Sequence, residues 1–594
     1  MTLNSAGSVS RREFLVSLGG ATLGKFVLPV AGELADALPA GSPRQLVTVP
    51  TKTSRPDGSF FLLWVEERGS ETEAMVWHPD TPEEAAEAQR FYEAARNYEK
   101  PAGLVQKFTN WLNGLLGKAH RSPEELALLR DIRESPDDLQ VILRYADWLT
   151  ARGDIYGEFI RVDCEMENLP TDDPRYRQLS QRWTELNEKH GATFIKPVTR
   201  LGISPTIVGR LLPAIWMEHG LVMRVEIEKP GVVPERVQEL FAAVPLLNNM
   251  ELNFENANVA VLAACPEMAQ IRKLTIRDCG VTDFAVKALV QSTHLGRLEH
   301  LSLAHNDLGV DALQLLAESE LLTRLKSLDL GGCSISYEVE RFAQSDKVAG
   351  LQELRLWLND LDPDAIHMLA STHGFKSLRK LDIGSNRFGP EGLEVLLGAP
   401  FIPQLTSLSL NSCELTSESL GLLANVPGLQ LARLDLGSND FTQGLSALQS
   451  APLLASLEEL DLTWCHLTDA GIEPIFTSSQ PSRLKSLQLG HNELGDGTAR
   501  AIAGSSRVSE LKTLELDGNK LTGSGVKALA ESPHLARLET LNLDDNPIGN
   551  EAATALANSP YLKRITQLIV SQSEVGSAGE ATLKQRFGDS VSCY

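Results

Sequence analysis

The feature that most constrains this sequence is an internal repeat of 26 or 27 residues that fills its C-terminal half. The repeated pattern is Leu-x-x-Leu-x-Leu-x-x-Asn/Cys-x-Leu, and a fixed period of this length is typical of solenoids built from stacked, similar units. A degenerate copy near 247–252 precedes twelve consecutive units. The twelve units begin at Ile271, Leu298, Leu325, Leu351, Leu378, Leu405, Leu431, Leu457, Leu484, Leu511, Leu538 and Ile565.

Within each unit the spacing of apolar residues changes. The Leu-x-Leu segment alternates as a strand does, whereas Val526, Leu529 and Ala530 mark one face of a helix. One unit is therefore predicted to be a short strand, a turn and a helix. Because neither element can bury its apolar side alone, neighbouring units must stack into an α/β solenoid with a parallel sheet inside and helices outside. The segment from Leu583 to Gly588 is assigned to a C-terminal cap.

This pattern resembles the leucine-rich-repeat family, and units of 26 to 27 residues that contain a helix look most like its ribonuclease-inhibitor-like branch. The resemblance covers about 300 residues, from 271 to 594. It implies a non-catalytic scaffold that binds another protein. The alternative it leaves open is a regulator of an enzyme, either inhibitor-like or similar to GTPase activators with such repeats.

Four of the seven cysteines occupy the Asn/Cys position of the repeat: Cys279, Cys333, Cys413 and Cys465. A side chain at this position is expected to turn inward and to bond backbone groups of the loop, which a buried thiol does weakly. Successive copies lie two or three repeats apart, roughly 10 to 15 Å at the strand spacing of a sheet. This separation excludes a disulfide or a shared metal, so the four cysteines are interpreted as structural.

The residues that line the concave face can be read from the alternation of the strands, because the middle residue of Leu-x-Leu points away from the core. Five of these twelve side chains are acidic and one is basic, which favours a basic or neutral protein partner. This middle column consists of Thr275, Ser302, Asp329, Arg355, Asp382, Ser409, Asp435, Asp461, Gln488, Glu515, Asn542 and Ile569.

Two tryptophans, Trp357 and Trp464, flank this column and are predicted to anchor the partner, because tryptophan combines a large apolar contact with one hydrogen-bond donor. His305 and His491 lie in the same loops. Further flanking positions hold Glu353, Glu459, Asp517, Asp544 and Asp545. The alternative is that the acidic residues only keep the sheet solvated and that each tryptophan packs over neighbouring strands.

Residues 122–190 are expected to form a small helical domain ahead of the solenoid, and 191–270 to hold the N-terminal cap and the degenerate repeat. Ser122-Pro123-Glu124-Glu125 has the signals of a helix start, and Ser135-Pro136-Asp137-Asp138 repeats them. Gly153 and Gly157 are predicted to close turns. A further helix is predicted over 172–190, and a strand over 220–227.

Part of this region resembles the repeat-companion domain that accompanies such repeats in planctomycete-type bacteria. The matching residues are Tyr145-Ala146-Asp147-Trp148-Leu149, Gly153-Asp154 and Glu158-Phe159-Ile160. The resemblance implies no activity. Asp147 and Glu158 are therefore interpreted as ordinary helix residues and Trp148 as a core residue.

The first 40 residues resemble a twin-arginine export signal. Arg11-Arg12 is followed by a weakly apolar stretch from Leu15 to Val30 and then by small residues near Ala37. This predicts export to the periplasm; the alternative is an ordinary amphipathic helix of a cytoplasmic protein. Residues 41–121 resemble no family, with a strand expected over 59–65 and a helix over 81–100.

Several function classes are disfavoured by what the sequence contains. A net charge of −23 argues against binding to nucleic acid, and no run of 18 apolar residues could form a membrane span. The usual motifs of hydrolases, metalloproteases and nucleotide-binding loops are missing, so we expect no catalytic residue, cofactor or metal. Gly523-Ser524-Gly525 superficially resembles a dinucleotide loop, but the next segment is another repeat and leaves no room for that fold.

Overall fold

The computed structural model describes residues 121–592, apart from 171–172, 202, 204–214, 229–235, 256 and 337, and the backbone of four strands before residue 121. The chain forms two compact units, Met1–His120 and Arg121–Tyr594. The predicted export signal and the predicted helix over 81–100 lie outside the described residues.

The first unit contains a small antiparallel sheet. β3 (Phe60–Arg68) pairs with β4 (Glu71–Trp77) along one edge and with β1 (Gln45–Leu46) and β2 (Thr51–Ser54) along the other. The strand predicted over 59–65 is therefore confirmed as the first half of β3. Sequence analysis predicted neither its partners nor the sheet.

The second unit begins with a group of helices: α4 (Pro123–Glu134), α5 (Leu139–Ala151), α6 (Tyr156–Glu167), α7 (Pro174–Phe194) and the short α8 (Lys196–Thr199). The predicted start of α4 is confirmed, because Ser122 Oγ accepts a hydrogen bond from the Glu125 N–H at 3.1 Å. The predicted helix over 172–190 corresponds to α7.

Two details of the helical region differ from the sequence prediction. Ser135 ends α4, and Asp138 caps α5 by accepting from the Gln140 N–H at 2.9 Å, so the second start signal is displaced by three residues. Gly157 closes no turn; it lies inside α6, where a Cβ would overlap the carbonyl oxygen of Ala146 in α5. Its role is to let two helices approach closely.

Asp147 and Glu158, which the sequence analysis interpreted as ordinary helix residues, each form an ion pair with an arginine of the helical region. Asp147 pairs with Arg161, and Glu158 pairs with Arg182 at 2.8 Å. Trp148 is only half-buried, because it lies at the margin of the helical core with the Arg152 guanidinium 3.8 Å from its ring centroid. The prediction of Trp148 as a core residue is therefore only partly right.

The helices cover the N-terminal end of the large sheet. Ile160 and Cys164 of α6 share a core with Leu221 and Met223 of the first parallel strand. At the turn before that strand, a Cβ on Gly220 would lie 2.8 Å from the Cα of Ile160. The helical region and the solenoid thus form one packed body at this junction.

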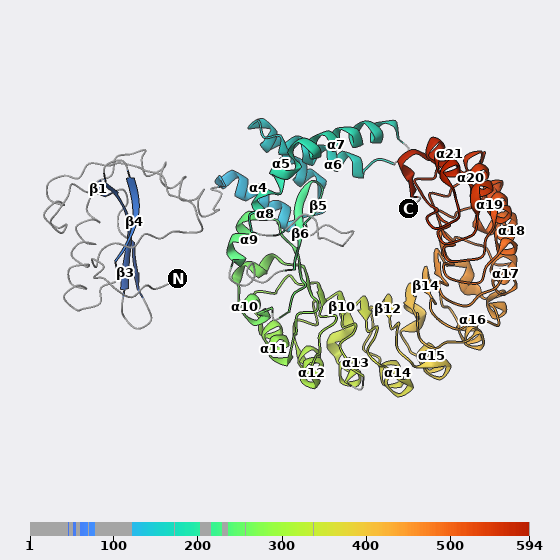
Figure 1. Ribbon diagram of the computed structural model, residues 1–594. Helices are drawn as coiled ribbons and strands as arrows, with labels where there is room; N and C mark the ends of the chain where they lie inside the picture. Colours follow the sequence, from blue (N-terminus) through green and yellow to red (C-terminus); the bar gives the residue numbers. More distant parts are fainter. Residues whose placement is uncertain are drawn as a thin grey trace, which may run out of the picture. The chain divides into compact units, whose positions relative to one another are not determined.

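The repeats form a 16-stranded sheet in chain order (Figure 1). All strands pair in parallel except β5, which forms a hairpin with β6. The first strands are β5 (Ile215–Glu218), β6 (Leu221–Ile227), β7 (Asn249–Leu252), β8 (Lys273–Ile276), β9 (His300–Ser302), β10 (Ser327–Asp329), β11 (Glu353–Arg355) and β12 (Lys380–Asp382). The remainder are β13 (Ser407–Ser409), β14 (Arg433–Asp435), β15 (Glu459–Asp461), β16 (Ser486–Gln488), β17 (Thr513–Glu515), β18 (Thr540–Asn542), β19 (Gln567–Ile569) and β20 (Val591–Ser592).

The register follows the leucines of the repeat. Leu328, Leu354 and Leu381 are directly paired across neighbouring strands, and none is more than 2 % exposed. This confirms the predicted parallel sheet with its leucines in the core. The strand predicted over 220–227 is confirmed as β6, and the degenerate copy near 247–252 contains β7. The sheet is longer than predicted only by β5 and β20.

Helices line the outer side of the arc (Figure 1). They are α9 (Val237–Ala243), α10 (Val259–Ala263), α11 (Asp283–Gln291), α12 (Val310–Glu318), α13 (Val339–Ala343), α14 (Pro363–Ala370), α15 (Gly389–Leu397), α16 (Leu420–Ala424), α17 (Asp469–Thr477), α18 (Asp496–Gly504), α19 (Gly523–Ala530), α20 (Gly549–Ala557) and α21 (Ser577–Phe587). Leu583 of α21, which the sequence assigned to a cap, is fully buried.

The repeat that begins at Leu431 departs from the predicted strand, turn and helix. Residues 431–456 are all described, and the short 3-10 turn Ser446–Leu448 stands there in place of the helix. The 3-10 turn Pro452–Ala455 precedes the next strand, as equivalent turns do in other repeats. Gly444 adopts a left-handed φ of 83°, and a Cβ on it would lie 2.9 Å from the Cα of Gly471. The close approach of the next repeat at Gly444 therefore accompanies the loss of a regular helix here.

The asparagines of the repeat connect neighbouring units. Asn386 Oδ1 accepts from the N–H groups of Asn359 and Leu361 at 2.9 and 3.0 Å. Its Nδ2 donates to the carbonyls of Leu356, Ile383 and Gly384 at 3.0, 2.8 and 3.2 Å. One fully buried amide therefore satisfies five backbone groups from two repeats.

Cysteine fills the same position with fewer bonds. Cys413 Sγ donates to the carbonyls of Ile383 and Asn411 at 3.5 and 3.3 Å, and a thiol offers no strong acceptor for the N–H groups. Burial raises the pKa of Cys333, Cys413 and Cys465 to about 12, so these thiols stay protonated. The four cysteines of the repeat are free and buried, which confirms their structural interpretation.

The glycines of the dinucleotide-like segment also have a packing role. Gly523 and Gly525 lie in the first turn of α19, and a Cβ on Gly525 would lie 3.1 Å from the Cβ of Ala499 in α18. Adjacent helices can therefore pack closely at this point.

Asp469, at the start of α17, caps the next helix. Its carboxylate accepts hydrogen bonds from the N–H groups of Gly495, Gly497 and Thr498 and from the Thr498 hydroxyl, at 2.6 to 3.1 Å. Burial opposes ionisation of Asp469, but these four bonds outweigh it and lower its pKa below the ordinary value.

This capping predicts a pH-dependent stability. Asp469→Asn keeps one acceptor and is expected to lower the free energy of unfolding at pH 7 by about 1 kcal/mol. Because the folded-state pKa is lowered, the contribution of Asp469 is present above the unfolded pKa of about 3.9 and is lost as the pH falls towards the folded value. Urea denaturation from pH 3 to pH 7 should therefore show the difference between wild type and variant shrinking at acid pH. A constant difference would contradict the assignment.

Candidate functional site

The middle column of the concave face is in register along the sheet, as predicted. Asp329 lies beside Arg355, Arg355 beside Asp382, and Asp435 beside Asp461. Most of these side chains are half-buried, whereas Arg355 is exposed. The sheet therefore brings together the predicted residues Asp382, Asp435 and Asp461 on one surface.

The aspartates of this column also support the loops that follow the strands. Asp329, Asp382, Asp435 and Asp461 each accept a hydrogen bond, at 2.8 to 3.1 Å, from the N–H two residues later. Asp435 additionally accepts from Ser409 Oγ at 2.7 Å and from Asn411 Nδ2 at 2.9 Å. These bonds fix the ends of the strands, so the acidic column has a structural role whether or not it binds a partner.

The same carboxylates are short of compensating charge. Burial, with the nearby charge of Asp435, raises the pKa of Asp382 and of Asp461, and burial also raises the pKa of Glu515. Hydrogen bonds that Asp382 and Asp461 accept from the loops, and that Glu515 accepts from Asn542 of β18, oppose these increases in pKa. A cationic group brought close to this column would relieve the repulsion between its carboxylates.

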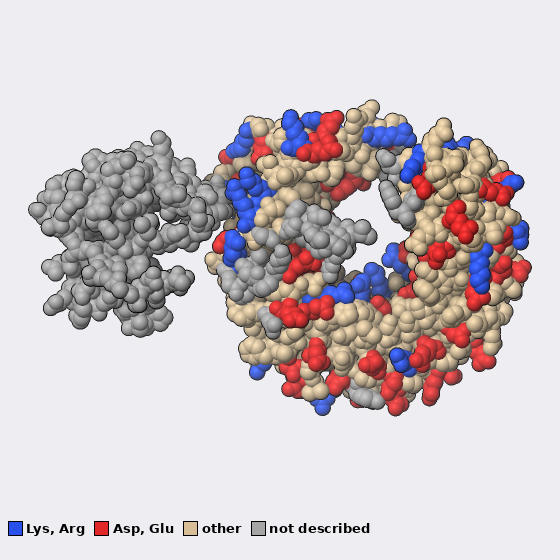
Figure 2. Space-filling model, viewed as in Figure 1, with Lys and Arg blue, Asp and Glu red and all other residues tan. Residues whose placement is uncertain are grey.

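Basic residues at the start of the strands make the concave face more mixed than the middle column suggests. Lys380 lies 3.4 Å and Arg355 2.6 Å from the carboxylate of Glu353, and Arg433 lies 2.9 Å from Glu459. Figure 2 shows basic side chains on the inner side of the arc, beside β10 and β12. Arg355 belongs to the predicted middle column, whereas Lys380 and Arg433 were not among the predicted site residues.

A second row of side chains follows the strands, at the residue just before the Asn/Cys position. All twelve residues of this loop row have a φ between 48° and 64°, in the left-handed region that costs most residues about 1 kcal/mol. The loop row consists of Asp278, His305, Gly332, Leu358, Ser385, Ser412, Ser438, Trp464, His491, Gly518, Asp545 and Gln572. Leu358 and Trp464 are its exposed large apolar members, at 47 % and 54 % exposure.

The two predicted anchors therefore differ in environment. Trp357 is one residue earlier in its repeat than Trp464 is in its own, and its indole lies over Gly331, where a Cβ would overlap it. Its ring also meets that of His305 edge-on, with centroids 4.8 Å apart. Trp357 is consequently half-buried against its neighbours, and its exposed sequence neighbour Leu358 was missed.

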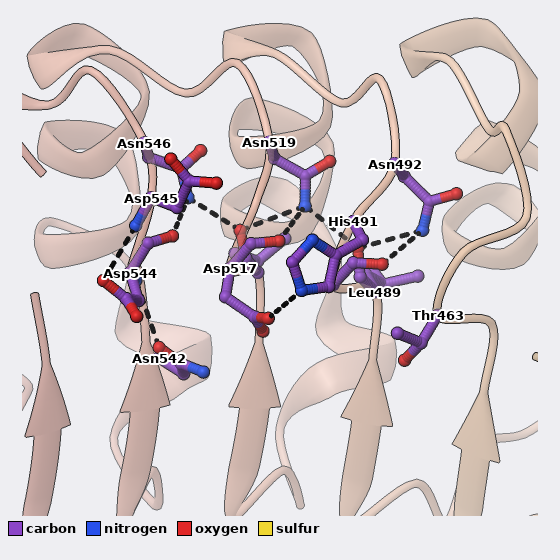
Figure 3. Close-up of polar contacts among 12 residues, drawn as sticks. Thr463, Leu489, His491, Asn492, Asp517, Asn519, Asn542, Asp544, Asp545 and Asn546 are labelled. Atoms are coloured by element: carbon purple, nitrogen blue, oxygen red, sulfur yellow. Dashed lines mark hydrogen bonds and ion pairs between the residues drawn. The ribbon is translucent and has the colours of Figure 1, made fainter. Parts of the chain in front are cut away.

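Trp464 is the first of a series of aromatic and acidic side chains on successive repeats. Its indole stacks on the imidazole of His491, with centroids 4.2 Å apart and planes inclined by 12°. His491 Nε2 lies 3.2 Å from Asp517 Oδ2, and Figure 3 shows the carboxylates of Asp544 and Asp545 beyond it. Burial and the charge of Asp517 raise the pKa of Asp544.

Between Leu358 and Trp464 the loop row carries only small side chains. Its members there are Ser385, Ser412 and Ser438. The four strand spacings from Leu358 to Trp464 amount to about 19 Å. The exposed side chains of Leu358 and Trp464 therefore lie at the two ends of a row of three serines, and the acidic middle column runs beside this row.

Among the described residues, no group of three or more His, Cys, Asp or Glu side chains could hold a metal ion. No described helix is long and apolar enough to cross a membrane. The middle column and the loop row offer a partner apolar contact, hydrogen bonding and charge.

Comparison with known sequences identifies the repeat. A leucine-rich-repeat model matches residues 376–397, 454–476, 482–503, 510–530 and 534–557. The fold is a leucine-rich-repeat solenoid. The structure places each matched stretch on the large sheet and its outer helices, in the same register as the units read from the sequence.

Curated relatives of the solenoid include two ribonuclease inhibitors. The one from Mus musculus is 27 % identical over 322 residues, which are 45 % of this chain and 70 % of the relative. The one from Sus scrofa is 30 % identical over 287 residues, again 45 % of this chain but only 58 % of the relative. The human leucine-rich repeat-containing protein 14 is 29 % identical, with 38 % of this chain and 44 % of the relative covered. The chain therefore spans less than two thirds of two of these three relatives.

Solved structures match this chain at lower sequence identity. A yeast complex of Rad7 and Elc1 matches with a TM-score of 0.40 and 17 % identity, over 68 % of this chain and 92 % of that one. An internalin from Listeria monocytogenes matches with a TM-score of 0.32 and 17 % identity, over 63 % and 90 %.

Proposed function

We propose that this protein is a non-catalytic scaffold that binds a basic or neutral protein on the concave face of its repeats and on the adjoining loop row. The observation that carries the proposal is Trp464, a 54 % exposed indole held in a left-handed loop position and stacked on His491 beside carboxylates. An exposed, well-supported tryptophan is a typical anchor of a protein interface. Leucine-rich repeats are a protein-interaction fold, in agreement with this proposal.

The contact is proposed to have an apolar and an electrostatic part. Trp464 provides the main apolar anchor and the half-buried Trp357 a smaller one, with His491 and His305 as their respective ring partners. Asp382, Asp435 and Asp461, with Asp329 and Glu515 further along the column, attract the partner during approach, while Arg355 interrupts the acidic run.

The proposal is tested by capturing a partner with the full chain and measuring the association of the captured protein with variants. Asp382→Asn together with Asp461→Asn keeps the acceptors for the loop N–H groups but removes two charges from the face. We expect about tenfold slower association at low salt, and a smaller difference at high salt, where the charges are screened.

The matched control removes two exposed charges from the outer helices, Glu394→Gln and Glu531→Gln, and should leave the association rate unchanged. If the two pairs of substitutions have equal effects, or if the concave pair has none, the captured protein binds elsewhere and the proposal is wrong.

The second candidate is an inhibitor of an enzyme, favoured by the likeness to two ribonuclease inhibitors. Titrating the full chain into a ribonuclease assay tests this candidate directly. Inhibition that is lost in the Trp464→Ala variant would support it, whereas unchanged ribonuclease activity would remove this candidate for ribonucleases and leave the scaffold proposal in place.

A further inference from the structure

A second exposed apolar surface lies on the outer helices, away from the concave face. Val261, Phe284 and Val310 are 45 %, 73 % and 68 % exposed and lie in the first turns of α10, α11 and α12. These three helices are consecutive and adjacent along the arc (Figure 1), and we refer to their three exposed apolar side chains as the apolar row.

The apolar row is confined to this part of the solenoid. Among the described helices of the repeats, α10 to α12 are the ones with exposed large apolar side chains. The first turns of later helices carry acidic residues, as those of α11 and α12 do, but no exposed large apolar side chain: Asp364 in α14, Glu391 in α15, Asp496 in α18 and Glu551 in α20. An apolar cluster that is not repeated cannot be a requirement of the repeat itself.

A carboxylate with an unused acceptor lies within the row. Asp283 occupies the same position in α11 as Asp469 does in α17, and its carboxylate lies over Gly309, just before Val310. Asp469 accepts four hydrogen bonds, but the buried Oδ1 of Asp283 has no hydrogen-bond partner. The buried Oδ1 is out of reach of a partner, so Asp283 contributes its negative charge, and not a free acceptor, to a contact at this point.

The surroundings of the row are acidic on balance. Asp307 and Asp311 are exposed near Val310, and Asp278 is exposed in the loop before α11, where it pairs with Arg277 at 3.4 Å. Lys287 is the nearby exposed cation of α11. The row therefore combines apolar contact with an excess of negative charge.

We propose that the apolar row is a docking surface for a basic, amphipathic helix of a partner protein. Packed helices lie about 8 to 10 Å apart, and seven residues of an α-helix advance about 10.5 Å, so apolar residues one heptad apart would meet successive members of the row. Lysine or arginine beside them would face Asp283, Asp307 and Asp311. This surface is separate from the concave face and does not depend on the function proposed for that face.

The test uses the full chain and a synthetic helical peptide of leucine and lysine, with leucines at heptad spacing and a photoreactive group at one leucine position. Cross-links mapped by mass spectrometry should lie in the first turns of α10, α11 and α12. Phe284→Ser with Val310→Ser should weaken binding of the peptide about tenfold without changing any charge, and Asp283→Asn should weaken it as well.

The controls separate this surface from others. Leu126→Ser removes a 49 % exposed apolar side chain from α4 and should leave peptide affinity unchanged. A peptide with glutamate in place of lysine should bind at least tenfold more weakly. Unchanged circular dichroism of all variants would show that they remain folded.

Three results would overturn the proposal. Cross-links confined to the concave strands would show that the peptide binds only there, and equal binding of the lysine and glutamate peptides would remove the role of charge. A wild-type dimer that Phe284→Ser with Val310→Ser converts to a monomer would assign the row to a second copy of this chain.

Discussion

Replacing Asn386 by alanine is expected to lower the free energy of unfolding by about 3 to 5 kcal/mol, because five buried backbone groups lose their partner at once. Water cannot replace the amide without opening the interface between two repeats, since Asn386 is fully buried. Urea denaturation followed by circular dichroism measures the loss. Hydrogen exchange should locate it in the repeats that begin at Leu351 and Leu378.

Two substitutions serve as controls for this effect. Asn386→Cys places at this position the residue that the chain itself uses at Cys333 and Cys413, and its thiol can still donate to carbonyls; we expect a smaller loss than with alanine. Cys413→Ala removes only two weak bonds and should cost about 1 to 2 kcal/mol. If Asn386→Ala and Cys413→Ala were equally destabilising, the bonds of the asparagine would not be what holds neighbouring repeats together.

Replacing Trp464 by alanine is expected to weaken binding of a captured partner by about 30- to 100-fold, because this exposed indole provides the largest apolar contact of the proposed interface. Its removal should change stability little, since more than half of the side chain already faces solvent. Titration calorimetry with the captured partner measures the affinity.

Trp357→Ala should give the opposite result. Its indole fills the space above Gly331 and contacts His305, so its loss is expected to cost about 1 to 3 kcal/mol of stability and to change affinity less. A Trp357→Ala variant that loses affinity as strongly as Trp464→Ala, with no loss of stability, would restore the original view of two equivalent anchors.

Much of the architecture could be predicted because the same spacing of apolar residues recurs in every unit of the repeat. Leucines at a fixed period select strands whose inner positions coincide, and the structure pairs Leu328 with Leu354 and Leu354 with Leu381. The position of each cysteine in the repeat predicted its burial. The same logic failed where a repeat deviates: nothing in the periodicity indicated that a 3-10 turn replaces the helix after Leu431, because the close approach of Gly444 to Gly471 is made between repeats.

The candidate site was less predictable, for a related reason. Trp357 and Trp464 lie in similar sequence contexts, but their positions in the repeat differ by one residue. That difference places Trp357 in line with the strand, over a glycine of the preceding repeat, and Trp464 in a left-handed loop that projects it outward. Leu358 was missed for the same reason, since a left-handed φ at a leucine has no signal in the sequence.

The sequence by itself thus determined the repeat, its strand and helix, the parallel register and the burial of the asparagines and cysteines, because these follow from residue spacing within a unit. Only the tertiary structure decided which side chains are accessible. Exposure of Trp464, partial burial of Trp357 and the unused oxygen of Asp283 each depend on what a neighbouring repeat places beside them, 26 or 27 residues away. The repeat therefore defines the scaffold, and contacts between repeats define the surfaces from which it can bind.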